Sequence, residues 1–464
     1  MIELEPEAMA EAMAATIVAR GRAGFPGRAA IDSREVGGGE LFFALSGERE
    51  DGGAYAGAAL ASGAWGIVAT PEWAGRLDPG ESGSWVFATP DPLRALQMLA
   101  RLWRRSVGAK VVGITGSVGK TSVKDMSRAM LPGRVHASEE NLNTEIGLPL
   151  TVLSAPADTE YLVLEMAMRG RGQIAELAAI AEPEVGVITN VGPVHVELLG
   201  SVEAIAEAKA ELIAGLGTDG VLVAPVEAGP LEQHLASAPR VIRFGPAGEI
   251  AVEQSRVEGE GISATVKTPA GSREFRFPFS EAHNLSNALA AIGAGLAAGA
   301  SLEDLSAGAG GITLSRYRGE RIDLGERGLI INDCYNANPI SMRAALEHLA
   351  GLEGNRIAVL GVMAELGPEQ DHFHAEIGDH ARRLGIDTVV GVGPVAREYG
   401  PDHWAGDTAE AAETVEALLS PDAKVLVKGS RSAGLEAVTA RLAAASGPDA
   451  NDPDAEDPER DTVA

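Results

Sequence analysis

Residues 111–126, VVGITGSVGKTSVKDM, combine the residue types and spacing of a phosphate-binding loop. An apolar run of strand length leads into a glycine-rich turn, after which Gly119, Lys120 and Thr121 open a helical pattern. Backbone N–H groups of such a loop bind phosphate at the positive end of the helix dipole, Lys120 would contact the β- and γ-phosphates, and Thr121 would bind Mg²⁺. The general pattern requires a glycine at position 114, where Ile114 stands. The loop therefore predicts nucleotide binding and leaves the reaction open.

Two polar side chains follow predicted parallel strands further along the chain. Glu165 ends the apolar run YLVLE, and His195 follows VGVITNVGPV. Because ligands bind at the carboxyl ends of the strands in open α/β sheets, we expect both side chains near the phosphate loop. The Glu165 carboxylate suits the Mg²⁺ of a bound nucleotide. The pattern is equally consistent with a structural and a functional role for His195.

Lys209 lies on the apolar side of a predicted helix. In GSVEAIAEAKAELIAGL it continues the 3-4-3-4 spacing of Val202, Ile205, Leu212 and Leu216. A lysine in such a stripe either extends its ammonium group to water or is buried with a lowered pKa. In the second case the neutral amine could react with CO₂ and form a carbamate, an anion able to hold a metal. The helical spacing alone favours the first alternative.

An α/β fold is needed to bring these residues together. From residue 109 on, apolar runs of strand length alternate with helical segments, as in KVVGITG, YLVLEMA, VGVITNVG, RGLIINDC, NRIAVLGVM, DTVVGVG and KVLVKGS. This alternation predicts parallel sheets with helices on both faces. Residues 241–279 predict an antiparallel β insertion, residues 283–299 predict a helix, and the first hundred residues contain short strands such as GELFFALSG and GAWGIVAT. We place domain boundaries near residue 107 and at residues 317–321.

The composition is that of a globular protein with several domains. The chain has 464 residues, 45% of them hydrophobic and 22% charged, with a formal net charge of −28. The negative charge argues against a nucleic-acid partner. Cys334 is the single cysteine, which we expect to be a small buried residue, and its lack of a partner favours a reducing compartment. The chain starts with acidic residues, and its longest apolar segment, residues 288–300, is too short to span a membrane. We therefore expect a cytoplasmic protein that does not enter a membrane.

Eight segments, in this order, resemble the Mur ligases: GITGSVGKTS, NLNTEIGLPL, LEMAMRGRGQI, ITNVGPVHVELLGS…AKAEL, AHNLSNALAA, INDCYNANPISM, LGVMAELG and VKGSRS. With an N-terminal DSR they span residues 31–432. Mur ligases use the loop T-G-x-x-G-K-[ST], which accounts for the spacing of residues 115–121. The resemblance implies a small α/β UDP-sugar-binding domain (1–107), an ATP-binding domain (108–317) and a Rossmann-like ligase domain (318–447). The acidic tail, residues 448–464, is expected to be disordered.

Within this family, DCYNANPISM (333–342) and KGSRS (428–432) resemble the member that adds D-alanyl-D-alanine to UDP-N-acetylmuramoyl-tripeptide. The member that adds diaminopimelate or lysine would be expected to carry a segment like DYAHTP. The resemblance implies a step of peptidoglycan synthesis in which ATP converts the tripeptide carboxylate to an acyl phosphate, which the dipeptide amine attacks. It leaves the third residue of the tripeptide open. Our default for the oligomeric state is a monomer.

Site residues carry over at positions that match the family's motifs. The resemblance implies that Lys120, Glu165, His195 and Lys209 are catalytic. It implies that Mg²⁺ is held by Thr121, Glu165, His195 and Lys209, the last as a carbamate. It assigns the phosphates of ATP to residues 115–122, which are Thr115, Gly116, Ser117, Val118, Gly119, Lys120, Thr121 and Ser122. It assigns the adenine to Asn284 and Asn287, and further nucleotide contacts to Arg318 and Asp333, with Asp333 on the ribose.

The same resemblance assigns the UDP-sugar to Asp32, Ser33 and Arg34. The peptide substrates are assigned to Asn143, Thr144, Tyr335, Asn336, Asn338, Lys428, Ser430 and Arg431. Structural alternatives exist for four groups of these positions: a solvated Asp32–Arg34 pair, a plain turn at residues 143–144, buried helix amides at residues 284 and 287, and an exposed basic turn at residues 428–431.

Three residues depart from the family's pattern: Val362 stands where Asp is expected, Gly53 where His is common and Thr144 where Asn is frequent. Each departure affects one peripheral contact. Two other classes of protein compete with a Mur ligase, namely a ligase of the folylpolyglutamate type and a P-loop protein that binds nucleotide without catalysis.

Overall fold

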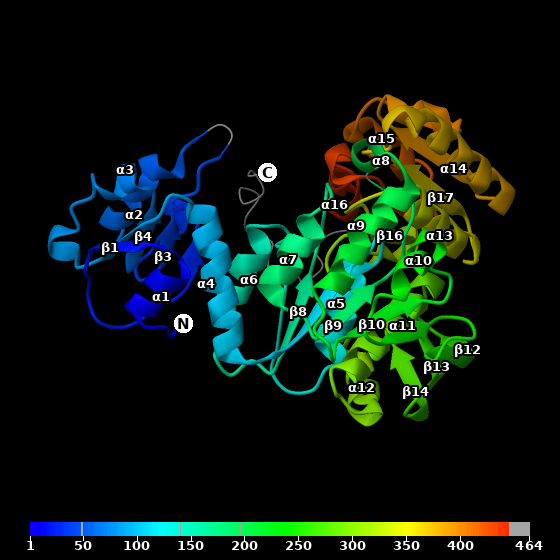
Figure 1. Ribbon diagram of the computed structural model, residues 1–464. Helices are drawn as coiled ribbons and strands as arrows, with labels where there is room; N and C mark the ends of the chain where they lie inside the picture. The colour runs from blue at the N-terminus through cyan, green and yellow to red at the C-terminus, as the bar shows by residue number, and fades with distance from the viewer. Residues whose placement is uncertain (48–49, 140, 195, 445–464) are drawn as a thin grey trace. The chain divides into compact units, whose positions relative to one another are not determined.

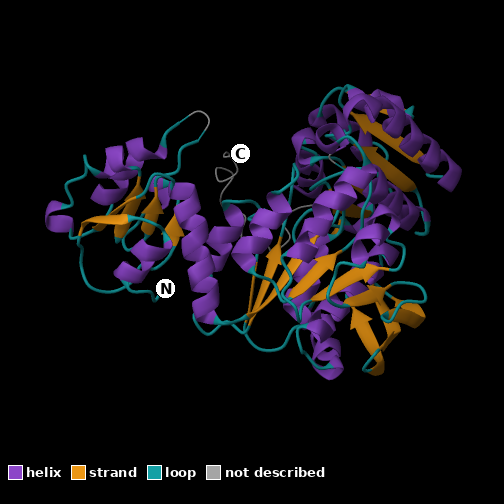
Figure 2. Ribbon diagram, in the orientation of Figure 1, coloured by secondary structure: helices purple, strands orange, loops and turns teal. Residues whose placement is uncertain are grey.

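The computed structural model describes residues 1–47, 50–139, 141–194 and 196–444. Two compact units divide at the junction between Ser315 and Arg316, two residues before the boundary expected near residue 317. Figures 1 and 2 show helices and strands in α/β arrangements in both units, within the described residues. None of the helices in the described ranges has the length and apolarity to cross a membrane. His195 and the predicted tail at 448–464 lie outside the described residues.

The first unit begins with a five-stranded sheet of order β1-β5-β4-β3-β2. β1 runs antiparallel to β5, and the other neighbours are parallel. The strands are β1 (Thr16–Ala19), β2 (Ala29–Ala30), β3 (Leu41–Phe43), β4 (Gly66–Ala69) and β5 (Trp85–Ala88). Helices α1 (Pro6–Ala12), α2 (Ala56–Ala61) and α3 (Pro71–Ala74) accompany them. The strands expected in GELFFALSG and GAWGIVAT are confirmed as β3 and β4.

A six-stranded parallel sheet of order β11-β10-β9-β6-β8-β7 carries the phosphate loop. Its strands are β6 (Lys110–Thr115), β7 (Val135–Ala137), β8 (Tyr161–Glu165), β9 (Val185–Ile188), β10 (Val221–Pro225) and β11 (Val241–Phe244). Side chains alternate between two cores, so that Leu162 and Leu164 enter one and Val163 enters the other. Two of the helices, α5 (Lys120–Met130) and α11 (Ala282–Ala297), pack in the core with Val163. The core with Leu162 takes α6 (Gly147–Ser154), α7 (Gln173–Ala181) and α9 (Val202–Ala214).

The antiparallel insertion is shorter than expected. β12 (Ala251–Glu258), β13 (Gly261–Thr268) and β14 (Gly271–Phe277) form a three-stranded antiparallel sheet. The start of the predicted insertion was wrong, because residues 241–244 are β11 and pair in parallel with β10. The helix expected at residues 283–299 is confirmed as α11. Short helices α8 (Val196–Leu199), α10 (Glu232–Leu235) and α12 (Leu302–Gly308) complete the first unit.

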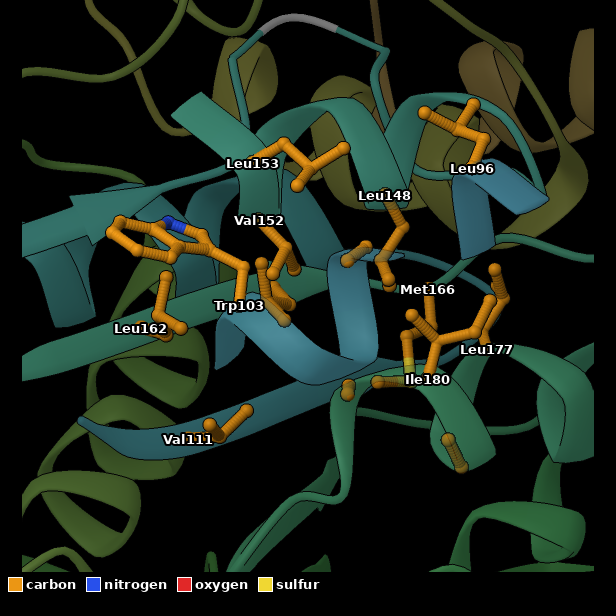
Figure 3. Packing of buried hydrophobic residues seen from close by; sticks show 14 of the residues in the cluster. Leu96, Trp103, Val111, Leu148, Val152, Leu153, Leu162, Met166, Leu177 and Ile180 are labelled. Carbon is orange, nitrogen blue, oxygen red and sulfur yellow. The ribbon is translucent and has the colours of Figure 1, made fainter. Parts of the chain in front are cut away.

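Helix α4 (Pro92–Val107) leads from the N-terminal sheet to β6. Asp91 caps its first turn through the N–H of Arg94, and Gly108 ends it in a left-handed conformation. Figure 3 shows its side chains Leu96 and Trp103 among the side chains of α6 and α7. The predicted boundary at residue 107 therefore falls on the last residue of a helix whose buried face contributes to the same core as the central sheet.

The second unit contains a sheet of order β15-β16-β20-β17-β18-β19. Its strands are β15 (Glu320–Asp323), β16 (Leu329–Asp333), β17 (Arg356–Leu360), β18 (Thr388–Val392), β19 (His403–Ala405) and β20 (Lys424–Lys428), and only β15 is antiparallel to its neighbour. Its helices are α13 (Pro339–Ala350), α14 (Gln370–Leu384), α15 (Thr408–Glu416) and α16 (Glu436–Ala444). Cys334 is buried as expected, and burial raises the pKa of its thiol to about 12.

Candidate active site

The phosphate loop joins β6 to α5. Gly116 has a φ of 151° and Gly119, which precedes the first helical residue, has a φ of 85°. A Cβ atom at Gly116 would lie 1.8 Å from Thr189 Oγ1, and one at Gly119 would lie 2.4 Å from Asn287 Oδ1. Both positions therefore require glycine, for backbone conformation and for close packing. Lys120 Nζ donates a hydrogen bond to the carbonyl of Gly116 at 3.0 Å. The remaining loop residues are buried or half-buried: Thr115, Ser117, Val118, Thr121 and Ser122.

The segment after β9 holds the loop in shape. Asn190 pairs with the backbone of Val118 twice, because its Oδ1 accepts from the N–H at 2.9 Å and its Nδ2 donates to the carbonyl at 3.1 Å. Thr189 Oγ1 donates to the same carbonyl at 2.5 Å. Ser117 donates its N–H to the carbonyl of Asn190, and its hydroxyl bonds the backbone of Gly192. Sequence reasoning missed Thr189 and Asn190, although both stand in the TNVGPVH segment that drew attention to His195.

Glu165 lies at the centre of a buried polar network beside the loop. Its Oε2 accepts from the Thr121 hydroxyl at 2.8 Å, and its Oε1 accepts from Asn143 Nδ2 at 2.9 Å. Glu165 is only 3% exposed, and it ends β8, the strand next to β6. Asn143 is thus more than part of a plain turn. Thr144 accepts the N–H of Gly147 at the start of α6, so its hydroxyl has a local structural partner.

Lys209 is buried in α9, which begins after the capping residue Ser201. Its side chain is 2% exposed, so the alternative in which its ammonium group extends to water was wrong. Burial, followed by the positive charge of Lys120, holds the pKa of the Lys209 ammonium group well below its ordinary value. A neutral amine is the form that reacts with CO₂.

The donor set beside the loop suits a magnesium nucleotide. Mg²⁺ in nucleotide sites commonly takes one or two carboxylates together with substrate phosphates and water. The adjacent Thr121 hydroxyl and Glu165 carboxylate provide oxygen ligands, and a carbamate on Lys209 would add another. No cluster of three or more His, Cys, Asp or Glu side chains suited to a metal occurs in the described ranges, from which His195 is excluded.

Asn284 and Asn287 lie in the first turns of α11. Asn284 is 2% exposed, donates to Glu281 and accepts from Asn287 Nδ2 at 3.1 Å. The alternative of a buried helix amide therefore describes Asn284. Asn287 packs against Gly119 of the phosphate loop, so it lies beside the segment predicted to bind phosphate. Contact of either side chain with adenine stays a prediction.

The residues assigned to the UDP-sugar form a turn in which Arg34 is exposed and Asp32 and Ser33 are half-buried. Residues 33–35 make one turn of 3-10 helix, and Asp32 accepts the N–H of Arg34. The guanidinium of Arg34 donates to both carboxylate oxygens of Asp32 and lowers the pKa of that carboxyl. The structure thus shows the solvated pair foreseen as the alternative, with Ser33 between the two residues. Binding of the UDP-sugar by this turn stays a prediction.

The departure at Gly53 has a structural cause. Trp73 donates its indole N–H to Asp51 Oδ2 at 2.8 Å, and Asp51 also accepts the N–H of Gly53. A Cβ atom at Gly53 would lie 2.0 Å from the Trp73 ring. The tryptophan therefore occupies the space that a larger side chain at position 53 would need.

In the second unit, Asp333 and Lys428 end the neighbouring strands β16 and β20 and stand opposite each other in the register. Lys428 Nζ donates to Asp333 Oδ2 at 2.6 Å and to the carbonyl of Asn336 at 3.1 Å. The Lys428 side chain is 2% exposed. An exposed basic turn is therefore not what the structure shows at this position.

Other residues assigned to the peptide substrates make local contacts. Asn338 caps α13 by accepting the N–H of Ser341 at 3.0 Å. Ser430 accepts the N–H of Ala364 and donates its own N–H to the carbonyl of Val362. The contact at Val362 thus uses the main chain, which any residue there can provide.

Two arginines assigned to the site stack on tyrosines. The Arg318 guanidinium lies 4.2 Å from the ring centroid of Tyr335, and that of Arg431 lies 5.1 Å from Tyr317. Arg431 also lies 3.5 Å from Glu436. These contacts form two arginine–tyrosine pairs within the second unit.

A buried ion pair on α5 was not foreseen. Lys124 Nζ lies 2.9 Å from Asp125 Oδ1, with side-chain exposures of 5% and 7%. Asp125 Oδ2 accepts from both the N–H and the hydroxyl of Ser315, at 2.8 Å each. The helix that begins at the phosphate loop is thus fastened to the last residue of the first unit.

The parallel sheet, the phosphate loop and the buried Glu165 beside it define a P-loop nucleotide-binding protein of the α/β class. The Mur ligase middle domain matches residues 114–295, and the Mur ligase glutamate ligase domain matches residues 317–431. The UDP-N-acetylmuramoyl-tripeptide–D-alanyl-D-alanine ligase of Bacillus subtilis is 36% identical over 427 residues, which cover 89% of this chain and 92% of that protein. The chain belongs to the Mur ligase family, in the group of UDP-N-acetylmuramoyl-tripeptide–D-alanyl-D-alanine ligases.

Solved structures are similar over nearly the whole chain. MurF from Acinetobacter baumannii has a TM-score of 0.85 at 28% identity, covering 94% of this chain and 98% of that one. MurF ligase from Thermotoga maritima, solved in complex with ADP, has a TM-score of 0.81 at 27% identity, covering 90% and 97%. These similarities confirm the fold class expected from the sequence.

Proposed function

We propose that this chain is an ATP-dependent ligase that joins D-alanyl-D-alanine to UDP-N-acetylmuramoyl-tripeptide, with release of ADP and phosphate. The relatives named above support this reaction as a step of peptidoglycan synthesis. The structural observation that carries the proposal is the buried carboxylate of Glu165, held between Thr121 of the phosphate loop and Asn143. This network supports the proposal, because it keeps a carboxylate oxygen beside the loop that would hold the nucleotide and its cation.

The chemistry explains why ATP is needed. An amine does not attack a carboxylate at neutral pH, because the carboxylate oxygen is a poor leaving group. Transfer of the γ-phosphoryl group to the tripeptide carboxylate gives an acyl phosphate, which the dipeptide amine attacks with loss of phosphate. Lys120 and the loop N–H groups stabilise the charge on the transferred group. When bound at Thr121 and Glu165, Mg²⁺ would neutralise part of that charge.

Lys209 and the division into domains complete the proposal. A carbamate on Lys209 would turn a buried neutral amine near Lys120 into an anion able to hold the metal, and the lowered pKa of Lys209 supports this modification. We propose the division at residues 107 and 317, with a UDP-sugar-binding, an ATP-binding and a ligase domain. A monomeric protein of the cytoplasm, where ATP is available, stays a prediction.

The test is phosphate release by the full chain with ATP, Mg²⁺, UDP-N-acetylmuramoyl-tripeptide and D-alanyl-D-alanine, each omitted in turn. Phosphate should appear only when all are present, together with a pentapeptide product detected by mass spectrometry. Lys120→Ala serves as the inactive control. Phosphate release that does not depend on the dipeptide and gives no pentapeptide would refute the proposal and favour a nucleotide-binding protein of another kind.

Two further arms separate the remaining alternatives. Tripeptides with diaminopimelate and with lysine at the third position are assayed side by side, which identifies the preferred substrate. Glutamate addition to a folate, together with failure to bind a UDP-sugar, would favour a ligase of the folylpolyglutamate type.

A further inference from the structure

Lys428 has hydrogen-bond partners for all three of its N–H donors. Its ammonium group donates to Asp333 Oδ2 at 2.6 Å and to the carbonyl of Asn336 at 3.1 Å, and it lies 3.4 Å from the carbonyl of Asp333. An ammonium group has three donors, so these oxygens account for its capacity. Since the side chain is 2% exposed, a substrate carboxylate could reach it only if these bonds were broken.

Asp333 is the more accessible partner of the pair. Its side chain is 22% exposed, against 2% for Lys428, and both residues stand at the carboxyl end of their strands. The Lys428 ammonium holds Oδ2, which leaves Oδ1 to accept a further hydrogen bond. The pair therefore presents one oriented carboxylate oxygen at the edge of the sheet where α/β proteins bind ligands.

The same ammonium group also fixes the turn that follows β16. Its bond to the carbonyl of Asn336 holds the residues between Asp333 and the capping residue Asn338. Ser430, two residues after Lys428, donates its hydroxyl to Asn336 Oδ1 at 3.4 Å. The end of β20 and the residues after it thus hold the middle of the turn at residues 334–338 through bonds to Asn336 and Ala337.

We propose that Lys428 is a positioning residue, which orients the carboxylate of Asp333 and the turn at residues 334–338 and does not contact the dipeptide. The inference rests on the proposed function and on the expectation, implied by the resemblance, that the Asp333 carboxylate contacts the ribose of ATP. It predicts that Lys428 acts through Asp333. Loss of either residue should then have the same kinetic consequence.

The test is a double-mutant cycle with Lys428→Met, Asp333→Asn and the double variant, assayed with ATP and D-alanyl-D-alanine varied separately. Each single change should lower kcat/KM for ATP by about 10- to 100-fold. The kcat/KM of the double variant should lie within about 3-fold of that of the less active single variant. The KM for the dipeptide should change less than about 3-fold in Lys428→Met. Lys424→Met, at the opposite end of β20, is the matched control and should behave as the wild type.

A rise of about 10-fold or more in the dipeptide KM of Lys428→Met, with kcat and the ATP parameters unchanged, would overturn the proposal, as would effects that multiply in the double variant. Folding is checked by thermal unfolding. If Lys428→Met does not fold, the double variant, which removes both charges together, is compared with Asp333→Asn. An equal kcat/KM for ATP in these two variants supports the proposal, and a lower value in the double variant overturns it. If the wild type does not ligate, the same cycle is measured on ADP affinity by calorimetry, so failure of the proposed function is seen separately.

Discussion

Asn190 should determine how well the phosphate loop binds nucleotide, although no phosphate contact is assigned to it. Its side chain makes two hydrogen bonds to the peptide groups of Val118, at 2.9 and 3.1 Å. Replacement with leucine keeps the approximate volume and removes both bonds. The loop would then have to be ordered by the nucleotide, and the cost would appear in the binding free energy.

The magnitude follows from the partners that remain. Each neutral hydrogen bond contributes about 0.5–1.5 kcal/mol net. The carbonyl of Val118 keeps the bond from Thr189 Oγ1, and since Val118 is half-buried, we expect water to replace the bond to its N–H. We therefore expect the lower part of the summed range, about 1–2 kcal/mol, which corresponds to about a 5- to 30-fold weaker affinity for ADP.

The assay is isothermal titration calorimetry of ADP with Mg²⁺, with thermal unfolding as the check on folding. Asn190→Asp keeps the acceptor for the Val118 N–H but loses the donor and adds a negative charge beside the phosphates, so it should bind ADP more weakly than Asn190→Leu. Asn355→Leu, at the residue before β17 in the second unit, is the control and should bind as the wild type. An ADP affinity of Asn190→Leu within about 2-fold of the wild type would refute the reasoning.

Three more outcomes are expected. Lys209→Ala should lose most ligase activity and recover part of it when a short carboxylate is added, whereas full activity without rescue would contradict a carbamate. Asp125→Ala strands the buried Lys124 ammonium and removes the acceptor for Ser315, so urea denaturation should show a loss of about 3–5 kcal/mol in the free energy of unfolding, and a loss below about 1 kcal/mol would speak against a buried pair. Hydrogen bonds from Arg105, and then from Arg101, lower the pKa of Glu182 to about 2, from 4.5. Its stabilising contribution is therefore complete above pH 4.5 and is lost as the pH falls towards 2, so Glu182→Gln should flatten the fall in melting temperature over this range, and an unchanged profile would refute the assignment.

Local patterns predicted which elements carry several residues of the candidate site, because apolar runs of this length indicate buried strands and helices. The apolar run before Glu165 indicated a buried strand, and the strand ends at that residue. The helical spacing placed Lys209 on an apolar stripe but could not say whether its head reaches water, since that depends on what covers the helix. The four alternating residues of β11 were compatible with the antiparallel insertion and with the parallel sheet. In the structure they pair in parallel with β10.

The amino-acid sequence by itself determined the α/β class, the phosphate loop, the strand that ends at Glu165 and the resemblance to the Mur ligases. These features depend on short runs of residues, because the spacing of apolar residues and the positions of glycine determine the local backbone structure. Only the tertiary structure decided the partners: Asn190 with a peptide group 72 residues away, Lys428 with Asp333 at a separation of 95, and Ser315 with Asp125 at 190. The physical reason is the strand order, because β20 lies between β16 and β17, and adjacency in a sheet is set by the packing of the whole unit.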